Sequence, residues 1–298
     1  MKTAASGPPT APRADAGRDT ASDITSDTAS ETGSGPTMTA IVQDTYGPVA
    51  EQVLRLAETA RPAIEADEVL VRVRAASVDR GTWHLMAGSA YLMRLAGFGF
   101  RAPKALNPGR SLAGTVESVG ENVTGFQPGD EVYGTCAGAF ASYASAKASR
   151  LAAKPASLSF EQAAAVPVSA LTALQAVRRA QVQAGQRVLI IGASGGVGTF
   201  AVQIAKAHGA EVTGVCSTAK TDLVRAAGAD HVIDYTRGDF ADGERRYDAI
   251  LDIGGGSGLA QLRRDGPPAP GAPGLPAHEP EAVHVHGVGE LRRPDRPA

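Results

Sequence analysis

The sequence predicts an α/β protein in which a small β-barrel domain precedes an incomplete, doubly wound parallel sheet. Short strand-like segments separated by glycine turns occupy the first part of the chain. A glycine cluster then separates an apolar strand from a helix, and strands alternate with helices beyond it. A chain of 298 residues has room for both domains. We place the β domain at residues 38–159 and the sheet domain at residues 160–264, between disordered tails at 1–37 and 265–298.

Composition excludes several classes of partner. The chain is 43% hydrophobic and 20% charged with a net charge of −2, so nothing favours nucleic acid or an acidic membrane surface. No apolar stretch approaches the length of a membrane span. Its two cysteines, Cys136 and Cys216, match no metal or redox spacing. We therefore expect a cytoplasmic protein with a small-molecule substrate.

The first tail contains almost no large apolar side chain and cannot offset the entropy of ordering. It lacks the apolar run of a secretory signal, and its scattered acids are unlike a transit peptide. A strand begins at Met38, which we interpret as an alternative initiator.

The β domain is predicted from five short segments that alternate or lie beside turn signals. They are Glu68–Ser77, Ser111–Val119, Gln127–Tyr133, Phe140–Ala144 and Ser149–Ala152. The Pro-Gly pair that opens the third is a turn signal. Many short strands between glycine turns are typical of a small barrel.

The second domain opens with long helical spacing over Phe160–Arg179, followed by a wholly apolar strand over Val188–Ile191. A glycine-rich turn follows, and helical spacing resumes at Thr199. Such a turn lets backbone N–H groups and the helix dipole face a pyrophosphate. The candidate binding residues are Ser194, Gly195, Gly196, Val197 and Gly198. The glycine spacing departs from G-x-G-x-x-G, so a tight strand–helix turn in another kind of α/β protein is the alternative.

The surrounding pattern supports a parallel sheet. Further strands are expected over Glu211–Cys216, His231–Tyr235 and Tyr247–Asp252, with a helix over Asp222–Ala227 and another near residues 259–263.

The end of the second strand predicts the cofactor. NAD sites place a carboxylate there, about 20 residues beyond the glycines, to bind the ribose 2′-hydroxyl. Residues 216–220 contain none, whereas Lys220 offers a cation and Ser217 and Thr218 offer hydroxyl donors. We predict NADPH over NADH. The alternative is that Lys220 is an ordinary solvated lysine at the start of a helix.

The second tail breaks the pattern where another strand should follow. Eight of the 19 prolines lie between Pro267 and Pro297, which excludes a sustained helix or central strand. We interpret the tail as out-of-frame translation or truncation, with a natural disordered tail as the alternative. Resequencing the region that codes for residues 263–266 would distinguish them.

These features together resemble the medium-chain dehydrogenase/reductase superfamily, in particular its zinc-independent, quinone oxidoreductase-like branch. Six motifs carry the resemblance: residues 75–79 (AASVD), 108–116 (PGRSLAGTV), 125–132 (GFQPGDEV), 167–173 (PVSALTA), 192–198 (GASGGVG) and 228–235 (GADHVIDY). The resemblance implies a GroES-like β-barrel domain followed by a Rossmann domain, with the active site in the cleft between them. The sheet is incomplete here because the family's returning strands are not recognisable.

The resemblance also implies that no metal is bound. Zinc-dependent relatives use a cysteine where this chain has residues 78–80, and a His-Glu pair near Arg110 and Ser111. Neither is present, nor is a four-cysteine lobe. The His284 and His286 pair alone does not make a closed zinc site.

A zinc-free relative would transfer hydride from NADPH to a quinone or enone and stabilise the charge that develops on the distal oxygen. The catalytic candidates are Asp79, Trp83 and Tyr91. Relatives commonly have asparagine where Asp79 stands. Trp83 would wall the pocket or pack in the core, and Tyr91 would donate a proton or pack in the core.

Three more positions are carried over as cofactor contacts. Thr172 would bond near the nicotinamide or pack in its helix, Tyr235 would lie beside the ribose phosphate, and Gly254 would admit the nicotinamide ribose. Relatives commonly dimerise through sheet strands that would lie beyond Arg264, so the resemblance leaves a homodimer in doubt. The competing hypothesis is a non-catalytic NADP(H)-binding protein or an inactive fragment.

Overall fold

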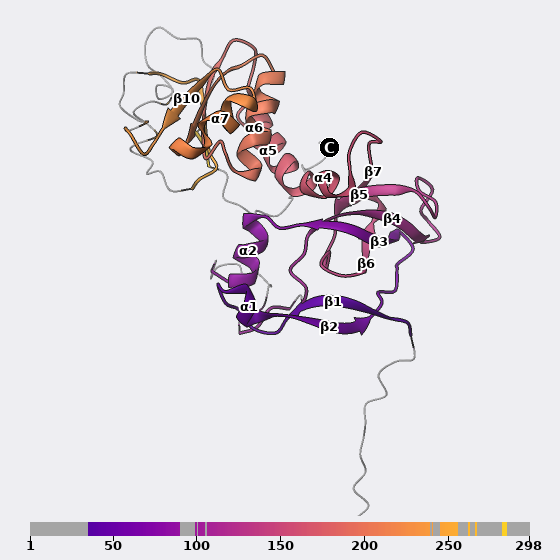
Figure 1. Ribbon diagram of the computed structural model, residues 1–298. Helices are drawn as coiled ribbons and strands as arrows, with labels where there is room; N and C mark the ends of the chain where they lie inside the picture. Colours follow the sequence, from indigo (N-terminus) through magenta and orange to yellow (C-terminus); the bar gives the residue numbers. More distant parts are fainter. Residues whose placement is uncertain are drawn as a thin grey trace, which may run out of the picture. The chain divides into compact units, whose positions relative to one another are not determined.

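The computed structural model describes residues 35–89, 99, 101–104, 106–238, 240, 245–255, 262, 266 and 282–284. It contains an antiparallel barrel-like sheet, a two-stranded hairpin and a parallel sheet with flanking helices (Figure 1). Within these residues, no helix is both long enough and apolar enough to cross a membrane.

The first domain is built on a five-stranded antiparallel sheet in the order β6-β3-β4-β5-β7. Its strands are β3 (Glu68–Ser77), β4 (Ser111–Val119), β5 (Glu131–Thr135), β6 (Tyr143–Lys147) and β7 (Leu151–Ala153). The bounds of β3 and β4 are those predicted. The last two strands begin two or three residues later than predicted, and the turn η2 (Ala148–Arg150) separates them. Alternating apolar side chains of this sheet form the core around Val69, Val71, Leu112 and Val132.

A hairpin of β1 (Thr37–Gln43) and β2 (Leu54–Ala60) belongs to the same domain, with the short helix α1 (Ala50–Val53) between the two strands. Only the start of β1 was predicted. The Ile41 N–H donates to the Phe140 carbonyl at 2.8 Å, which ties the hairpin to the strand region before β6. Helix α2 (Arg80–Ala87) follows β3 and ends at Gly88, whose φ of 61° suits glycine.

The single helix predicted over residues 160–179 is wrong. The structure has α4 (Phe160–Ala165) and α5 (Pro167–Arg179). Pro167 has no N–H to continue the first helix and instead occupies the first turn of the second, where none is needed. A capping box between Ser159 and Gln162 fixes the start of α4.

The second domain is a parallel sheet in the order β10-β9-β8-β11-β12. Its strands are β8 (Arg187–Ile191), β9 (Glu211–Cys216), β10 (His231–Asp234), β11 (Ala249–Asp252) and β12 (Ala282–His284). The strand order reverses between β8 and β11, and ligands of open α/β sheets bind at the carboxyl ends of strands at such a point. The fold class therefore matches the prediction.

Strand β12 departs from the prediction that residues 265–298 are disordered throughout. It pairs in parallel with β11 at the edge of the sheet. The physical reason lies in local composition: residues 281–293 form a proline-free interval in a proline-rich tail, so a ladder can form there.

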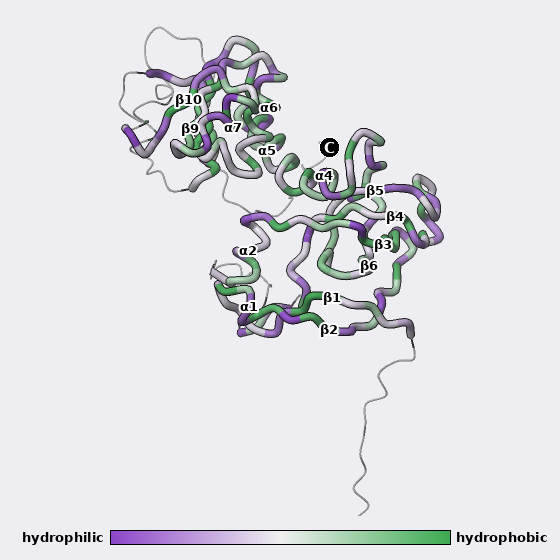
Figure 2. Tube along the Cα trace, in the orientation of Figure 1, coloured by the Kyte–Doolittle hydropathy of each residue, from purple (hydrophilic) through white to green (hydrophobic). Residues whose placement is uncertain are grey.

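Three helical segments join these strands: α6 (Gly196–Ala207), the turn η3 (Thr218–Lys220) and α7 (Thr221–Ala226). Helix α6 begins three residues before the predicted Thr199. The three glycines after Ser194 have no side chains to hinder the backbone, so the first helical turn forms over them. One face of the sheet packs on α5 and α6 through residues such as Val177, Ile190 and Val202. Figure 2 shows α5 and α6 as mixtures of hydrophobic and hydrophilic residues, as expected of helices that bury one face.

Candidate functional site

The turn between β8 and α6 lies at the carboxyl end of the central strand. Gly192 has a φ of 80°, and the Gly195 N–H donates to its carbonyl at 3.0 Å, which closes the turn. Gly195 is the N-cap of α6, and no side chain caps the helix. The N–H groups of the first helical turn therefore remain available to an anion, which the helix dipole favours.

The glycines of this turn have different physical reasons. A Cβ atom on Gly198 would lie 2.1 Å from the Gly192 carbonyl oxygen, so only glycine lets α6 pack this closely on the turn. A Cβ on Gly195 would have its nearest neighbour at 3.4 Å, which is ordinary contact. Packing thus explains Gly198, whereas the open side of Gly195 is where a ligand would approach. Ser194, just before Gly195, and Val197, just before Gly198, are half-buried.

Helix α5 contributes a residue that the sequence analysis missed. Ser169 is buried, and its hydroxyl lies 2.9 Å from the position of a Cβ on Gly196. This hydroxyl therefore borders the anion-binding turn. Thr172, which was predicted to contact the cofactor or to pack in its helix, donates its hydroxyl hydrogen to the Val168 carbonyl at 2.7 Å. In this structure the hydroxyl therefore bonds within α5. Ser169 could have been found only from the packing of α5 against α6.

The loop after β11 lies next to the same turn, at the point where the strand order reverses. The backbone nitrogen of Gly254 lies 3.2 Å from the position of a Cβ on Gly192. The buried carboxylate of Asp252 accepts a hydrogen bond from the Gly255 N–H at 2.9 Å and orders this loop. Gly254 therefore lies beside the anion-binding turn.

The ends of β9 and β10 form a polar cluster at the same edge of the sheet. The exposed Lys220 has no partner within the described part of the chain. Thr218, which we predicted as a donor to a phosphate, instead donates to the carboxylate of Asp234. That hydrogen bond, helped by Thr236, holds the pKa of Asp234 below its ordinary value. The Asp234 carboxylate therefore engages the Thr218 hydroxyl, whereas Ser217 and Lys220 remain able to contact a ligand.

Tyr235 follows Asp234 and is 57% exposed, an unusual degree for a tyrosine. Its backbone N–H donates to the Cys216 carbonyl at 3.1 Å, which continues the β9–β10 ladder and brings Tyr235 next to the polar cluster. The structure thus brings Ser217, Lys220 and Tyr235 to the carboxyl ends of β9 and β10.

Two of the three catalytic candidates, Asp79 and Trp83, lie at the start of α2. Asp79 is the N-cap of this helix, where one carboxylate oxygen accepts the Thr82 N–H at 2.8 Å. Its other oxygen and the Thr82 hydroxyl are buried and have no partner among the described residues. Trp83 is half-buried, donates its ring N–H to the Pro48 carbonyl at 3.3 Å and lies beneath the guanidinium of Arg80. The prediction for Tyr91 lies outside the described residues.

The described part of the chain contains no cluster of side chains that are typical metal ligands. Across the described ranges, no group of three or more His, Cys, Asp or Glu side chains converges in a way that could hold a metal. Both cysteines are free and buried, and burial raises the pKa of the Cys136 thiol to about 12. A neutral thiol is a poor metal ligand, because zinc binds the thiolate.

Two family profiles match the chain. Residues 65–156 match the alcohol dehydrogenase GroES-like domain, and residues 196–261 match the zinc-binding dehydrogenase family. The fold and the glycine turn are those of a Rossmann-type α/β protein with a GroES-like first domain.

Curated relatives support the same assignment. The mitochondrial NAD(P)H oxidoreductase RTN4IP1 of Mus musculus is 39% identical over 242 residues, which cover 74% of this chain and 60% of the relative. The 2-methylene-furan-3-one reductase of Solanum lycopersicum is 34% identical over 238 residues, covering 74% of this chain and 58% of the relative. The chain therefore spans about 60% of the length of these relatives.

Solved structures agree in fold. The quinone oxidoreductase of Coxiella burnetii has a TM-score of 0.67 and 32% identity, covering 73% of this chain and 69% of that one. The Escherichia coli quinone oxidoreductase complexed with NADPH has a TM-score of 0.62 and 28% identity, covering 72% of this chain and 65% of that one. The chain belongs to the medium-chain dehydrogenase/reductase family.

Proposed function

We propose that this protein is an NADPH-dependent oxidoreductase that transfers hydride to a quinone, enone or related carbonyl compound without zinc. The observation that carries the proposal is the glycine turn, where Gly198 packs the helix against the strand and Gly195 leaves the backbone open to an anion. The relatives, which include an NAD(P)H oxidoreductase and a 2-methylene-furan-3-one reductase, support the class of reaction.

The residues of the second domain fit a dinucleotide. The pyrophosphate would lie against the N–H groups of Gly195 to Gly198 and the Ser169 hydroxyl, on the open side of the turn. Lys220, Ser217 and Tyr235 would bind the 2′-phosphate, because Lys220 supplies an unpaired cation and Asp234 is already engaged by Thr218. When bound, NADPH supplies the hydride.

Residues at the start of α2 support the substrate half of the proposal. We assign Asp79, Thr82 and Trp83 to the acceptor side. Tyr91 remains a candidate for the same role on the basis of the sequence alone. The buried, unpartnered atoms of Asp79 and Thr82 are polar groups that a bound acceptor would satisfy. The Thr82 hydroxyl would donate to the acceptor's oxygen as negative charge develops on it, and Asp79 fixes the first turn that holds Thr82.

The test is a fluorescence titration of the full chain with NADPH and, in parallel, NADH. Saturable binding with tighter affinity for NADPH supports the cofactor assignment. Oxidation of NADPH on addition of a simple quinone or enone then supports hydride transfer, and a chelator should leave the rate unchanged. Binding without turnover would favour a non-catalytic NADP(H)-binding protein, and no binding of either cofactor would refute the proposal.

A further inference from the structure

At the end of the parallel sheet opposite the glycine turn, the structure has a cavity of about 280 Å³ that the proposed function does not use. Arg187, Glu211 and His231, the first residues of β8, β9 and β10, line it together with Thr213, Arg245 and Tyr247. The cavity therefore lies at the amino ends of the strands. The five residues of β8 separate it from the glycine turn by about 16 Å.

The lining carries an excess of positive charge. The guanidinium groups of Arg187 and Arg245 have no partner among the residues that the structure describes. Arg246 also lines the cavity but has an interaction of its own, so Arg187 and Arg245 are the two arginines that can bind a ligand. Glu211 is the acidic residue of the lining, and its carboxylate is bound to His231 at 2.9 Å. The backbone N–H of Arg187 donates to the Asp248 carboxylate, and this bond does not involve the Arg187 guanidinium.

A buried polar atom also points to a ligand. Tyr247 is 4% exposed, and its hydroxyl has no hydrogen-bond partner in the described part of the chain. Buried hydroxyl groups are nearly always hydrogen-bonded, because an unsatisfied one is destabilising. A ligand oxygen in the cavity would accept this hydrogen bond alongside the two guanidinium groups.

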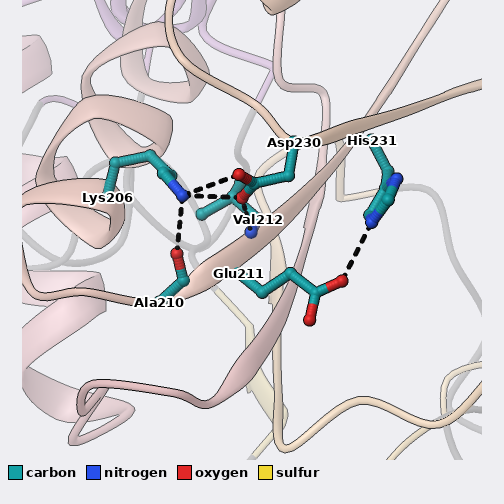
Figure 3. Close-up of polar contacts among 6 residues, drawn as sticks. All are labelled: Lys206, Ala210, Glu211, Val212, Asp230 and His231. Atoms are coloured by element: carbon teal, nitrogen blue, oxygen red, sulfur yellow. Dashed lines mark hydrogen bonds and ion pairs between the residues drawn. The ribbon is translucent and has the colours of Figure 1, made fainter.

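The neighbouring framework holds the strand starts in place. Lys206 on α6 contacts both carboxylate oxygens of Asp230, at 2.7 and 2.8 Å, and the Ala210 carbonyl at 3.1 Å (Figure 3). Asp230 also accepts the Val212 N–H at 2.7 Å. These contacts join α6, β9 and β10 immediately beside the Glu211–His231 pair, so the lining is preorganised.

We propose that this cavity binds a small oxyanion, the phosphate or carboxylate group of a small molecule, at a site separate from the glycine turn. Two arginines with planar, multidentate donors suit either group. The volume lies just below the range of about 300–1,000 Å³ typical of drug-sized ligands, which favours a small anion over a dinucleotide.

The test measures thermal unfolding of the full chain in chloride buffer, with inorganic phosphate or acetate added at constant ionic strength. A ligand that binds only the folded state raises the melting temperature with a saturable dose response. Arg187→Gln combined with Arg245→Gln should weaken the apparent affinity by about tenfold or more. Arg178→Gln is the matched control, because Arg178 is an exposed arginine on α5 with no described partner.

Tyr247→Phe separates the site from the fold. In chloride it should unfold at the same or a higher temperature, because it removes an unsatisfied hydroxyl, yet it should bind phosphate more weakly. A larger effect of phosphate than of acetate would identify a phosphorylated ligand, and the reverse a carboxylate. The proposal is overturned if neither anion acts saturably, if the arginine double variant responds like the wild type, or if Arg178→Gln loses the response equally.

Discussion

Substituting two glycines of one turn should separate the packing of the second domain from its ligand binding. In Gly198→Ala, the new Cβ would lie 2.1 Å from the Gly192 carbonyl oxygen and 2.7 Å from the Ala193 backbone. These neighbours are backbone atoms and cannot rotate away, so α6 must shift away from the turn. In Gly195→Ala the nearest atom lies at 3.4 Å and the φ of −80° suits alanine.

The magnitudes follow from these distances. Overpacking against rigid atoms costs about 1–3 kcal/mol, and the Gly198 clash is at the upper end. For a folded region of this size, each kcal/mol shifts the melting temperature by about 2–4 °C, so Gly198→Ala should unfold about 6–12 °C lower. Gly195→Ala should stay within about 1 kcal/mol of the wild type, because replacing a favourable N-cap residue with alanine typically costs about that much. Its methyl group should nevertheless weaken NADPH binding by about tenfold.

The assay combines thermal unfolding without cofactor and fluorescence titration with NADPH for both variants. The two variants should show opposite patterns, with stability lost in Gly198→Ala and affinity alone lost in Gly195→Ala. It would be refuted if Gly198→Ala unfolded at the wild-type temperature, or if Gly195→Ala bound NADPH as tightly as the wild type.

Three further predictions test charges and thiols. Lys220→Ala should weaken NADPH binding by about 10-fold and leave NADH unaffected, since one cation near a phosphate dianion contributes about 1–2 kcal/mol in water; Lys147→Ala, which removes an exposed cation from β6, should change neither affinity. Partial burial raises the pKa of Asp230, but the Lys206 hydrogen bond and a backbone N–H bring it below the ordinary 3.8. The folded state thus favours the carboxylate. Its stabilisation is complete above the ordinary pKa of 3.8 and is lost as the pH falls through the lower pKa of the folded state. Asp230→Asn should therefore lower stability at pH 7, and acid-unfolding curves should show the difference from the wild type shrinking as the pH falls. Burial keeps the Cys136 thiol neutral, so a thiol reagent at pH 8 should label it only after unfolding.

Local patterns predicted much of the second domain. Strand β9 has the predicted bounds, because an apolar run bounded by turn residues suits a buried parallel strand. Pro167 was visible in the sequence, and its missing N–H is enough to explain the break between α4 and α5. Strand β2 was missed because it has no fully buried residue and therefore no clear apolar alternation. It forms by pairing with β1, after the short helix α1 turns the chain back.

The site was harder to predict where its contacts join distant segments. Thr218 and Asp234 are 16 residues apart, and they meet because the register pairs Asp234 with Cys216 across β9 and β10. Ser169 reaches Gly196 only because α5 packs on α6. Sequence spacing predicted the residues of the turn, but the partners of their side chains depend on packing between elements.

The parallel sheet also separates the two proposed anion sites. About 16 Å of β8 lies between the glycine turn and the cavity at Arg187, and the Debye length at physiological salt is about 8 Å. Charge at one edge is therefore largely screened from the other, and each site should bind its anion independently. The stabilisation by phosphate at the Arg187 edge should then add to that by NADPH. If saturating NADPH instead abolished the phosphate effect, the phosphate would be bound at the glycine turn, and the cavity would have no ligand of this kind.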